Sequence, residues 1–295
     1  MKEIKKVLLI VNPISGDINK EYIINAVQHK LHLLDAALNV YRTTGEKDKE
    51  AIQKLVRKNN YDRIIMAGGD GTIKLVAEAL LDNVIPIGII PAGSANGLAV
   101  NLEIPQELDS QLEVALGDHL TKMDILEIDN EVCLHISDLG VNAELIKNYE
   151  GSKIRGKLGY LLQSVPTLIY SKYSFEFEIQ LEHETLQKEG ILLAFANANK
   201  YGTGANVNPR GKIDDGVFEI LLFKNLDVLE ILNTLRNETD INSEFVEIIP
   251  VKKAKVICKK PVAFQIDGEY MGEKKEVSVK ISCKKLPIMS PNKAY

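Results

Sequence analysis

Two glycine-rich turns, each between an apolar run and a helical pattern, constrain this chain more than any other feature. The first turn, Gly68–Thr72, reads Gly-Gly-Asp-Gly-Thr, and the second, Pro91–Gly97, reads Pro-Ala-Gly-Ser-Ala-Asn-Gly. The preceding runs have the composition of buried strands. A glycine turn between a strand and a helix start presents backbone N–H groups and the positive end of a helix dipole to an anion. The pair of turns therefore predicts a polyphosphate site.

The patterns around the turns predict a parallel sheet covered by helices on both faces. Strand patterns alternate with helical patterns through the first ~125 residues, a βαβα order that is typical of such sheets. The predicted strands are 7–11, 38–41, 63–67 and 85–90, and the predicted helices are 18–34, 47–58, 73–81 and 98–102. Ligands bind outside the carboxyl ends of the strands of these sheets. The loops Asn12–Gly16 and Thr43–Gly45 are expected to join both glycine turns at this edge.

The pattern changes after Lys122, which predicts a second domain of antiparallel strands. Residues 173–181 alternate strictly between apolar and polar, as a half-buried antiparallel strand does. Two short strands are predicted within 123–138, further strands at 191–198, 217–223, 245–258, 262–266 and 277–281, and helices at 139–148, 156–170 and 226–236. We predict a domain of residues 1–125 and a β-sandwich domain with added helices of residues 126–284. The tail, 285–295, is expected to pack on the first domain, and the cleft between the domains is the expected site.

Acidic residues in turns suggest metal and proton chemistry. Asp70, inside the first glycine turn, would repel bare phosphate, so a divalent cation is predicted there. The adjacent Asp214 and Asp215 form either an ordinary Asp-Gly hairpin turn or a Mg²⁺ site that relieves their repulsion. Asp267 and Glu269 likewise lie either in a hairpin turn or in a site where Asp267 accepts a proton from an attacking hydroxyl.

Composition removes several other classes of protein. A net charge of −5 argues against general nucleic-acid binding. The histidines and the three scattered cysteines show no zinc spacing, and this use of cysteine is typical of a reducing cytoplasm. No apolar run approaches the roughly 18 residues of a membrane-spanning helix, and the first residues do not read as a signal peptide. No serine lies in a G-x-S-x-G elbow, so a hydrolase is not indicated.

Taken in order along the chain, these motifs resemble the diacylglycerol/sphingosine lipid kinase superfamily, including its soluble bacterial diacylglycerol kinase branch. The resemblance extends over nearly the whole sequence. It rests on Asn12-Pro13-x-Ser15-Gly16, Gly69–Thr72, Pro91–Asn96, Asn101–Pro105, Gly140–Ala143, Lys157–Tyr160, Asp214–Phe218 and Asp267–Glu269. It implies a Rossmann-like, NAD-kinase-like α/β N-terminal domain and an antiparallel β-sandwich C-terminal domain with added helices.

The resemblance also implies an activity in phospholipid metabolism. The γ-phosphoryl group of ATP would move to the hydroxyl of a lipid such as diacylglycerol. Asp267 would be the general base, Asp70 would hold Mg²⁺, and Asp214 or Asp215 would order a second Mg²⁺. The residues that would contact the nucleotide are Asn12, Ser15, Thr44, Gly69, Gly71, Thr72, Ser94 and Glu269. Such a kinase would be cytoplasmic and would associate transiently with the inner face of the membrane, whereas homodimer formation is left open.

Two departures keep other substrates open. Lys74-Leu75 stands where the family often has Asn-Glu, and Gly93–Gly97 is closer to the sphingosine kinase form of that loop. A sphingosine- or ceramide-type kinase and an NAD kinase are therefore alternatives, as is a nucleotide- or lipid-binding regulator without turnover. Retention of Asp70, Asp215 and Asp267 argues against the regulator. The predicted helix 156–170, flanked by Lys153, Arg155, Lys157 and Lys172, is either a lipid-facing element or an ordinary packed helix.

Overall fold

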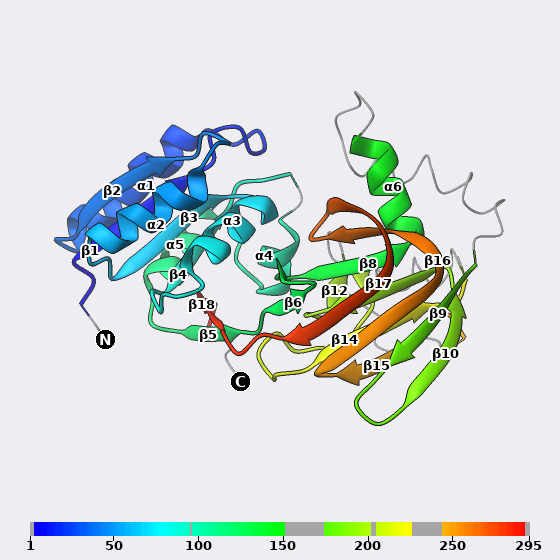
Figure 1. Ribbon diagram of the computed structural model, residues 1–295. Helices are drawn as coiled ribbons and strands as arrows, with labels where there is room; N and C mark the ends of the chain where they lie inside the picture. The colour runs from blue at the N-terminus through cyan, green and yellow to red at the C-terminus, as the bar shows by residue number, and fades with distance from the viewer. Residues whose placement is uncertain (1–2, 95, 151–173, 202–204, 226–243, 293–295) are drawn as a thin grey trace. The chain divides into compact units, whose positions relative to one another are not determined.

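The computed structural model describes residues 3–94, 96–150, 174–201, 205–225 and 244–292. The chain divides into two compact units, which are treated separately below. Unit 1 comprises Met1–Asp124 together with Cys283–Tyr295, and unit 2 comprises Ile125–Ser282 (Figure 1). The predicted helices 156–170 and 226–236 and the Lys157–Tyr160 motif lie outside the described residues.

Unit 1 is built on a sheet in the order β2-β1-β3-β4-β18-β5. Its strands are β1 (Lys6–Val11), β2 (Ala37–Arg42), β3 (Arg63–Gly68), β4 (Ile87–Pro91), β5 (Leu120–Met123) and β18 (Leu286–Met289). Strands β1 to β4 pair in parallel, so the loops that follow them leave the same edge. Strand β18, from the end of the chain, pairs in parallel with β4 and antiparallel with β5. The last residues thus complete a sheet begun by the first.

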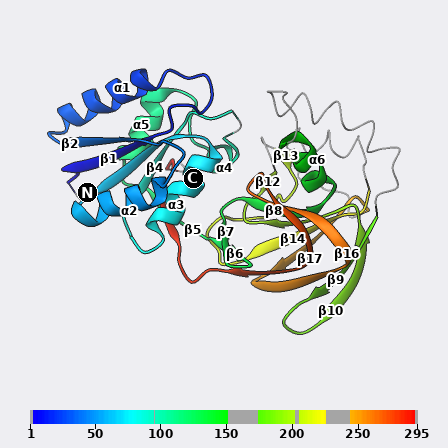
Figure 2. The same ribbon diagram turned by 45° about the horizontal axis from the view of Figure 1, so that its top comes forward.

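Helices cover both faces of this sheet (Figures 1 and 2). They are α1 (Lys20–Leu33), α2 (Asp48–Lys58), α3 (Asp70–Leu80), α4 (Gly97–Asn101) and α5 (Leu108–Leu116). Helices α1 and α5 pack on Val7, Leu9 and Val11 of β1, whereas Leu8 and Ile10 point to the opposite face and are equally buried. Burial on both faces explains why β1 and β3 read as unbroken apolar runs.

Unit 2 is a large antiparallel sheet with one described helix, α6 (Val141–Glu150). Its strands are β6 (Leu126–Ile128), β7 (Glu131–Cys133), β8 (Ile136–Gly140), β9 (Phe175–Gln180), β10 (Thr185–Gly190), β11 (Leu192–Ala196), β14 (Phe218–Phe223), β15 (Val246–Val251), β16 (Lys253–Ile266) and β17 (Glu269–Ile281). The order is β15-β14-β11-β8-β16-β17-β6-β7, and β9 pairs with β16 on one side and with β10 on the other. A separate short pair, β12 (Lys200–Tyr201) and β13 (Ala205–Asn206), lies outside this sheet.

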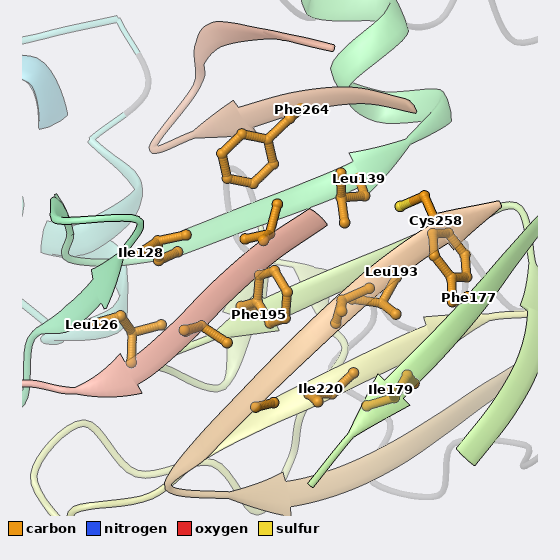
Figure 3. Close-up of a cluster of buried hydrophobic side chains, with 14 of the residues drawn as sticks. Leu126, Ile128, Leu139, Phe177, Ile179, Leu193, Phe195, Ile220, Cys258 and Phe264 are labelled. Atoms are coloured by element: carbon orange, nitrogen blue, oxygen red, sulfur yellow. The ribbon is translucent and has the colours of Figure 1, made fainter. Parts of the chain in front are cut away.

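The long strand β16 organises the core of unit 2. Its first half pairs with β9 and its second half with β8. On its other side it pairs with β17, and the register of this pairing shifts between Ile257 and Val262. This shift lets one strand serve two parts of the sheet, which enclose a common apolar core (Figure 3). Phe177, Phe195 and Phe264 lie in this core and are almost completely buried. The fold class predicted from the sequence, an α/β domain followed by an antiparallel β domain, is confirmed.

Several predicted boundaries in unit 2 are wrong for identifiable reasons. Residues 139–140 belong to strand β8 and not to the following helix, because Gly140, at φ +120°, makes the turn between them. The predicted strand 245–258 is two strands, since Lys252 belongs to neither and separates β15, which ends at Val251, from β16, which begins at Lys253. The predicted strand 262–266 is the second half of β16. Helix α5 and strands β5, β10 and β18 were not predicted.

Candidate active site

Three loops at the carboxyl ends of β1, β3 and β4 are hydrogen-bonded to one another. In the loop Asn12–Gly16, the backbone N–H of Asn12 donates to Ala67 O at 3.0 Å, and its side-chain amide donates to Thr72 Oγ1 at 3.2 Å. The Ser15 hydroxyl donates to Ala92 O at 3.1 Å. These bonds join the Asn12 loop to the first glycine turn (Gly68–Thr72) and to the second (Pro91–Gly97). The sequence-predicted convergence of the three loops is therefore present in unit 1.

The loops approach so closely that glycine is required at their contact. A Cβ atom on Gly93 would lie 2.4 Å from the Gly69 Cα, closer than atoms can pack. Gly16, at φ +53°, similarly faces the backbone of the second turn, where its Cβ would lie 2.7 Å from Ala92 O. A Cβ on Gly71, by contrast, would meet nothing within 4 Å. The glycines thus serve two purposes, since Gly69 and Gly93 pack the turns together while Gly71 leaves open space at the start of α3.

Asp70 connects the two glycine turns through its carboxylate. It accepts hydrogen bonds from the N–H groups of Gly97, at 2.8 Å, and Leu98, at 3.0 Å. These N–H groups begin helix α4, so the carboxylate satisfies donors that have no partner within the helix. The polyphosphate hypothesis assumed that the helix end was available to an anion. In this structure the Asp70 carboxylate already holds two of its amides.

Thr44, at the carboxyl end of β2, is held by a buried carboxylate. Asp48 of α2 is 6% exposed and accepts hydrogen bonds from the Tyr41 hydroxyl and from the backbone of Thr44 and Gly45. Burial alone would raise the pKa of Asp48, but these hydrogen bonds outweigh it and hold the pKa below its usual 3.8. Burial and the bond to Asp48 raise the pKa of Tyr41 to about 12. Thr44 therefore lies at the predicted edge, with its hydroxyl 3.2 Å from Asp48 Oδ1.

Lys20 is a residue of this region that the sequence reasoning missed. Its side chain is 8% exposed, and its ammonium group donates to the carbonyl oxygens of Ser15 and Ile18. Burial lowers the pKa of Lys20 and outweighs the opposing attraction of Asp17. Lys20 thus holds the end of the Asn12 loop through two of its carbonyl oxygens. In the sequence, Lys20 is simply a lysine at the start of a predicted helix, and nothing distinguishes it from a solvent-exposed lysine.

In unit 2, Asp267 lies in the tight turn between β16 and β17. Asp267, at φ +51°, and Gly268, at φ +88°, form its two central positions, as a two-residue hairpin requires. The Asp267 carboxylate accepts N–H groups from Leu134 and His135 at 2.9 Å and from Ile136 at 3.2 Å. The hairpin interpretation of this segment is therefore correct, and Asp267 as a general base stays a prediction. Glu269 begins β17 and is exposed.

The turn that carries Asp214 and Asp215 precedes strand β14, which holds the buried acid Glu219. Asp215 Oδ1 accepts the N–H of Val217 at 3.1 Å, and Gly216 has φ +76°. Glu219, 7% exposed, accepts the side-chain amide of Asn208 at 2.6 Å. Burial raises the pKa of Glu219, the Asn208 bond opposes this, and the nearby Asp215 raises it further. Across the described residues, no group of three or more His, Cys, Asp or Glu side chains could by itself hold a metal ion.

Comparison with protein families assigns both units. Residues 6–128 match the family described as the diacylglycerol kinase catalytic domain. Residues 136–290 match the YegS C-terminal NAD kinase β-sandwich-like domain. The chain belongs to the soluble bacterial diacylglycerol kinase-like family of lipid kinases. The resemblance inferred from the ordered motifs is thereby confirmed, and the enzyme is a lipid kinase.

Individual relatives match this lipid kinase over most of their length. The chain is 28% identical to a diacylglycerol kinase of Bacillus subtilis, with 91% of each sequence covered. It is 28% identical to a probable lipid kinase YegS of Escherichia fergusonii, again with 91% of each covered. A solved structure of a putative diacylglycerol kinase from Bacillus anthracis has a TM-score of 0.81 at 21% identity, with 99% and 98% covered. An NAD kinase from Archaeoglobus fulgidus scores 0.55 at 12% identity, over 97% and 94%. Both solved structures therefore have the same fold as this chain.

The predicted site residues of this lipid kinase fall into two groups. Unit 1 holds Asn12, Ser15, Thr44, Gly69, Asp70, Gly71, Thr72 and Ser94, and unit 2 holds Asp214, Asp215, Asp267 and Glu269. Lys74, one of the two family departures, is 8% exposed on α3. Ala95 lies outside the described residues. Where the chain is described, its helices are too short or too polar to cross a membrane.

Proposed function

We propose that this lipid kinase transfers the γ-phosphoryl group of ATP to the hydroxyl of diacylglycerol. The observation that carries the proposal is the hydrogen-bonded convergence of the Asn12 loop and both glycine turns at one sheet edge, in a chain of the diacylglycerol kinase-like family. Relatives named diacylglycerol kinase support the choice of lipid. Residues 1–125 would bind the nucleotide and residues 126–284 the lipid, in a cleft between the two domains, as the sequence predicts.

The nucleotide would be bound mainly by backbone groups and small side chains. Gly71, which has open space beside it, allows phosphate oxygens to approach the main chain, and Gly69, packed against Gly93, would contribute through its backbone. Thr72 and Ser94 would supply hydroxyl donors, and Ser15 would do so by exchanging its bond to a loop carbonyl for one to phosphate. Asn12 would keep the loops in register. Thr44 would extend the surface at β2, and Glu269 would contribute from unit 2.

The oxygen chemistry of these residues fits Mg²⁺ that arrives with ATP. Proteins usually hold this ion through one or two carboxylates, water and substrate phosphates, so a protein-only cluster is not needed. Asp70 would be the anchor in unit 1, because each of its oxygens accepts one amide and can accept another ligand. Asp214 and Asp215 would hold a second ion near the buried Glu219. When bound, Mg²⁺ would neutralise the negative charge that develops on the phosphate oxygens.

Asp267 would act as the general base. The lipid hydroxyl is protonated at neutral pH, so its oxygen attacks the γ-phosphorus as the bond to ADP breaks, and the proton passes to a carboxylate. Three backbone donors fix the orientation of the Asp267 carboxylate. Its Oδ2 receives a single amide among the described contacts, which leaves an acceptor position for that proton. The lipid would be taken from the inner face of the membrane, and a homodimer stays open.

The test is phosphate transfer from radiolabelled ATP to diacylglycerol, sphingosine, ceramide, undecaprenol and NAD, each offered separately. We expect diacylglycerol to be labelled fastest. Labelling of NAD without any lipid would overturn the proposal, and preference for sphingosine or ceramide would replace its substrate.

A second experiment tests the base. Asp267→Asn keeps one of the two oxygens that accept amides of residues 134–136 and replaces the other with an NH2 group, so the variant should lose some stability but still fold and bind ATP with wild-type affinity. Its turnover should fall by at least about 100-fold, the contribution typical of a general base. Full turnover in this variant would remove Asp267 from the chemistry.

A further inference from the structure

A buried polar network adjoins the Asp267 turn, on strands β8 and β16 of unit 2. Asp138 and Ser137 on β8 are fully buried, and Gln265 on β16 is 1% exposed. Gln265 and Asp138 are paired across the two strands, so their side chains share one face of the sheet. Burying an acid and an amide costs free energy unless each is hydrogen-bonded. Two apolar side chains at these positions would fill the same space in the sheet with a smaller desolvation penalty.

The hydrogen bonds of this network lead from the sheet interior to the turn. The Gln265 side-chain amide donates to Asp138 Oδ2, which also accepts the Asn142 amide at 2.7 Å. Gln265 Oε1 accepts the backbone N–H of Gly268 at 2.7 Å. The Ser137 hydroxyl donates to Gln265 O at 2.6 Å. The orientation of the Gln265 amide is therefore fixed at both ends, by an acid on one side and by the turn on the other.

The same turn is tied to the β7–β8 loop by a second set of bonds. The N–H of Asp267 donates to Ile136 O at 2.9 Å, and the Asp267 carboxylate accepts the three amides of residues 134–136. Asp267 is a non-glycine residue at positive φ, a conformation that persists only when its surroundings enforce it. The Gln265–Gly268 bond acts on the next residue of the turn. It therefore opposes relaxation of the backbone that carries Asp267.

We propose that Gln265 and Asp138 are positioning residues for the Asp267 carboxylate. Asp138 fixes the orientation of the Gln265 side-chain amide, and Gln265 in turn accepts the backbone N–H of Gly268. The turn therefore holds the Asp267 carboxylate in one orientation. This inference rests on the proposed role of Asp267 as general base. It predicts that the polar network affects turnover more than it affects affinity for ATP, because both side chains are buried inside unit 2 and away from solvent.

The decisive variants exchange the acid and the amide between the two strands. Gln265→Glu alone sets two carboxylates against each other, and Asp138→Asn alone sets two amides together. The double variant D138N/Q265E restores an amide donor opposite an acid and keeps an acceptor for Gly268. The side-chain amide of Asn142 has to rotate, so that its oxygen accepts from the amide introduced at position 138. Misplacing a catalytic group by about 1 Å can cost on the order of 100-fold in rate. We expect each single variant to lose about 10- to 100-fold in kcat, with KM for ATP nearly unchanged, and the double variant to recover most of this loss.

Val256→Ala is the matched control for stability. Val256 lies in the core on the other half of β16, fully buried and away from the turn. If the single variants and Val256→Ala have equal melting temperatures, only the network variants should lose kcat. Equal losses of kcat in all three, or wild-type kcat in a folded Gln265→Glu, would overturn the proposal. Where a single variant does not fold, the double variant still tests it, since a folded double variant with strongly reduced kcat contradicts positioning by the restored pair.

A double-mutant cycle with Asp267→Asn separates this inference from the proposed function. If Gln265 acts through Asp267, then Gln265→Glu should lower kcat in the wild-type background and have no further effect in Asp267→Asn. An equal loss in both backgrounds would refute positioning while leaving Asp267 as the base. Full turnover of Asp267→Asn would instead refute the base and the positioning role together.

Discussion

Replacement of Gly93 by alanine is the sharpest test of how unit 1 is assembled. The new Cβ would lie 2.4 Å from the Gly69 Cα and 2.9 Å from the Gly69 N, and neither is the end of a flexible side chain. Ordinary contacts begin near 3.4 Å, so the two glycine turns would have to separate by about 1 Å. The hydrogen bond from Ala92 N to Gly68 O, 2.9 Å long, spans the same gap and would be stretched beyond its effective range.

The cost of this substitution can be worked out from those two effects. Forcing a methyl group into a packed interior costs about 1–3 kcal/mol. Loss of one backbone hydrogen bond adds about 1 kcal/mol. We therefore expect Gly93→Ala to destabilise unit 1 by about 2–4 kcal/mol, equivalent to a fall in melting temperature on the order of 10 °C for a unit of this size.

Amide hydrogen exchange on the full chain is the appropriate assay, because it assigns the loss of stability to one unit. Amides of β3 and β4 should exchange faster in Gly93→Ala, while those of β16 and β17 should be unchanged. Gly71→Ala is the control, since its Cβ would meet nothing within 4 Å and alanine is favoured in a helix by about 0.5–1 kcal/mol. Wild-type exchange of β3 and β4 in Gly93→Ala would show that the turns do not pack as described.

Three further predictions concern buried or capping carboxylates. The pKa of Asp48 is lowered by folding, so its stabilisation is present above about pH 3.8 and is lost as the pH falls through the folded pKa. The difference in melting temperature between the wild type and Asp48→Asn should therefore shrink in acid. The pKa of Glu219 is raised above 4.5, so its contribution is present below that pH and is lost as the pH rises through the folded pKa. Glu219→Gln should match or exceed the wild-type melting temperature at pH 8 and lose that advantage near pH 4. Asp70→Asn should lower stability by about 1–2 kcal/mol without ATP or Mg²⁺ present, because it weakens two charge-assisted bonds, and a denaturant titration of the ligand-free protein measures this.

The first half of the chain was predictable because its signals are local. Strands β1 and β3 are buried on both faces, so continuous apolar runs mark them, and glycines mark the loops that follow β3 and β4. Unit 2 was harder because its pairings are between distant segments. The boundary between β15 and β16 falls at Lys252, and a single lysine is no clear sign that a strand ends. In unit 1, β18 was missed because its partners β4 and β5 lie far away in the sequence.

The candidate site was predictable by position but not by contact. The motif order places Asp70 and Asp267 in turns; Asp267 lies in one, whereas Asp70 is the first residue of helix α3. That Asp70 would accept amides from the second glycine turn, or Asp267 amides from the β7–β8 loop, depends on three-dimensional neighbours that no spacing encodes. Gln265 and Lys20 were missed for the same reason, because a buried amide and a buried cation look like surface residues in a sequence.

These contacts change what the retained acids mean. A chain without turnover would be expected to lose Asp70 and Asp267 if these residues served catalysis alone. Each carboxylate, however, satisfies backbone amides of a neighbouring loop in the ligand-free protein, so each contributes to stability whether or not a phosphoryl group is transferred. A fixed acceptor also requires no reorganisation when charge develops during a reaction. Structural need and catalytic use therefore favour the same residues, and a comparison of stability with turnover in the Asp→Asn variants separates them. A kinase loses far more in turnover than in stability on Asp267→Asn, whereas a regulator loses only stability.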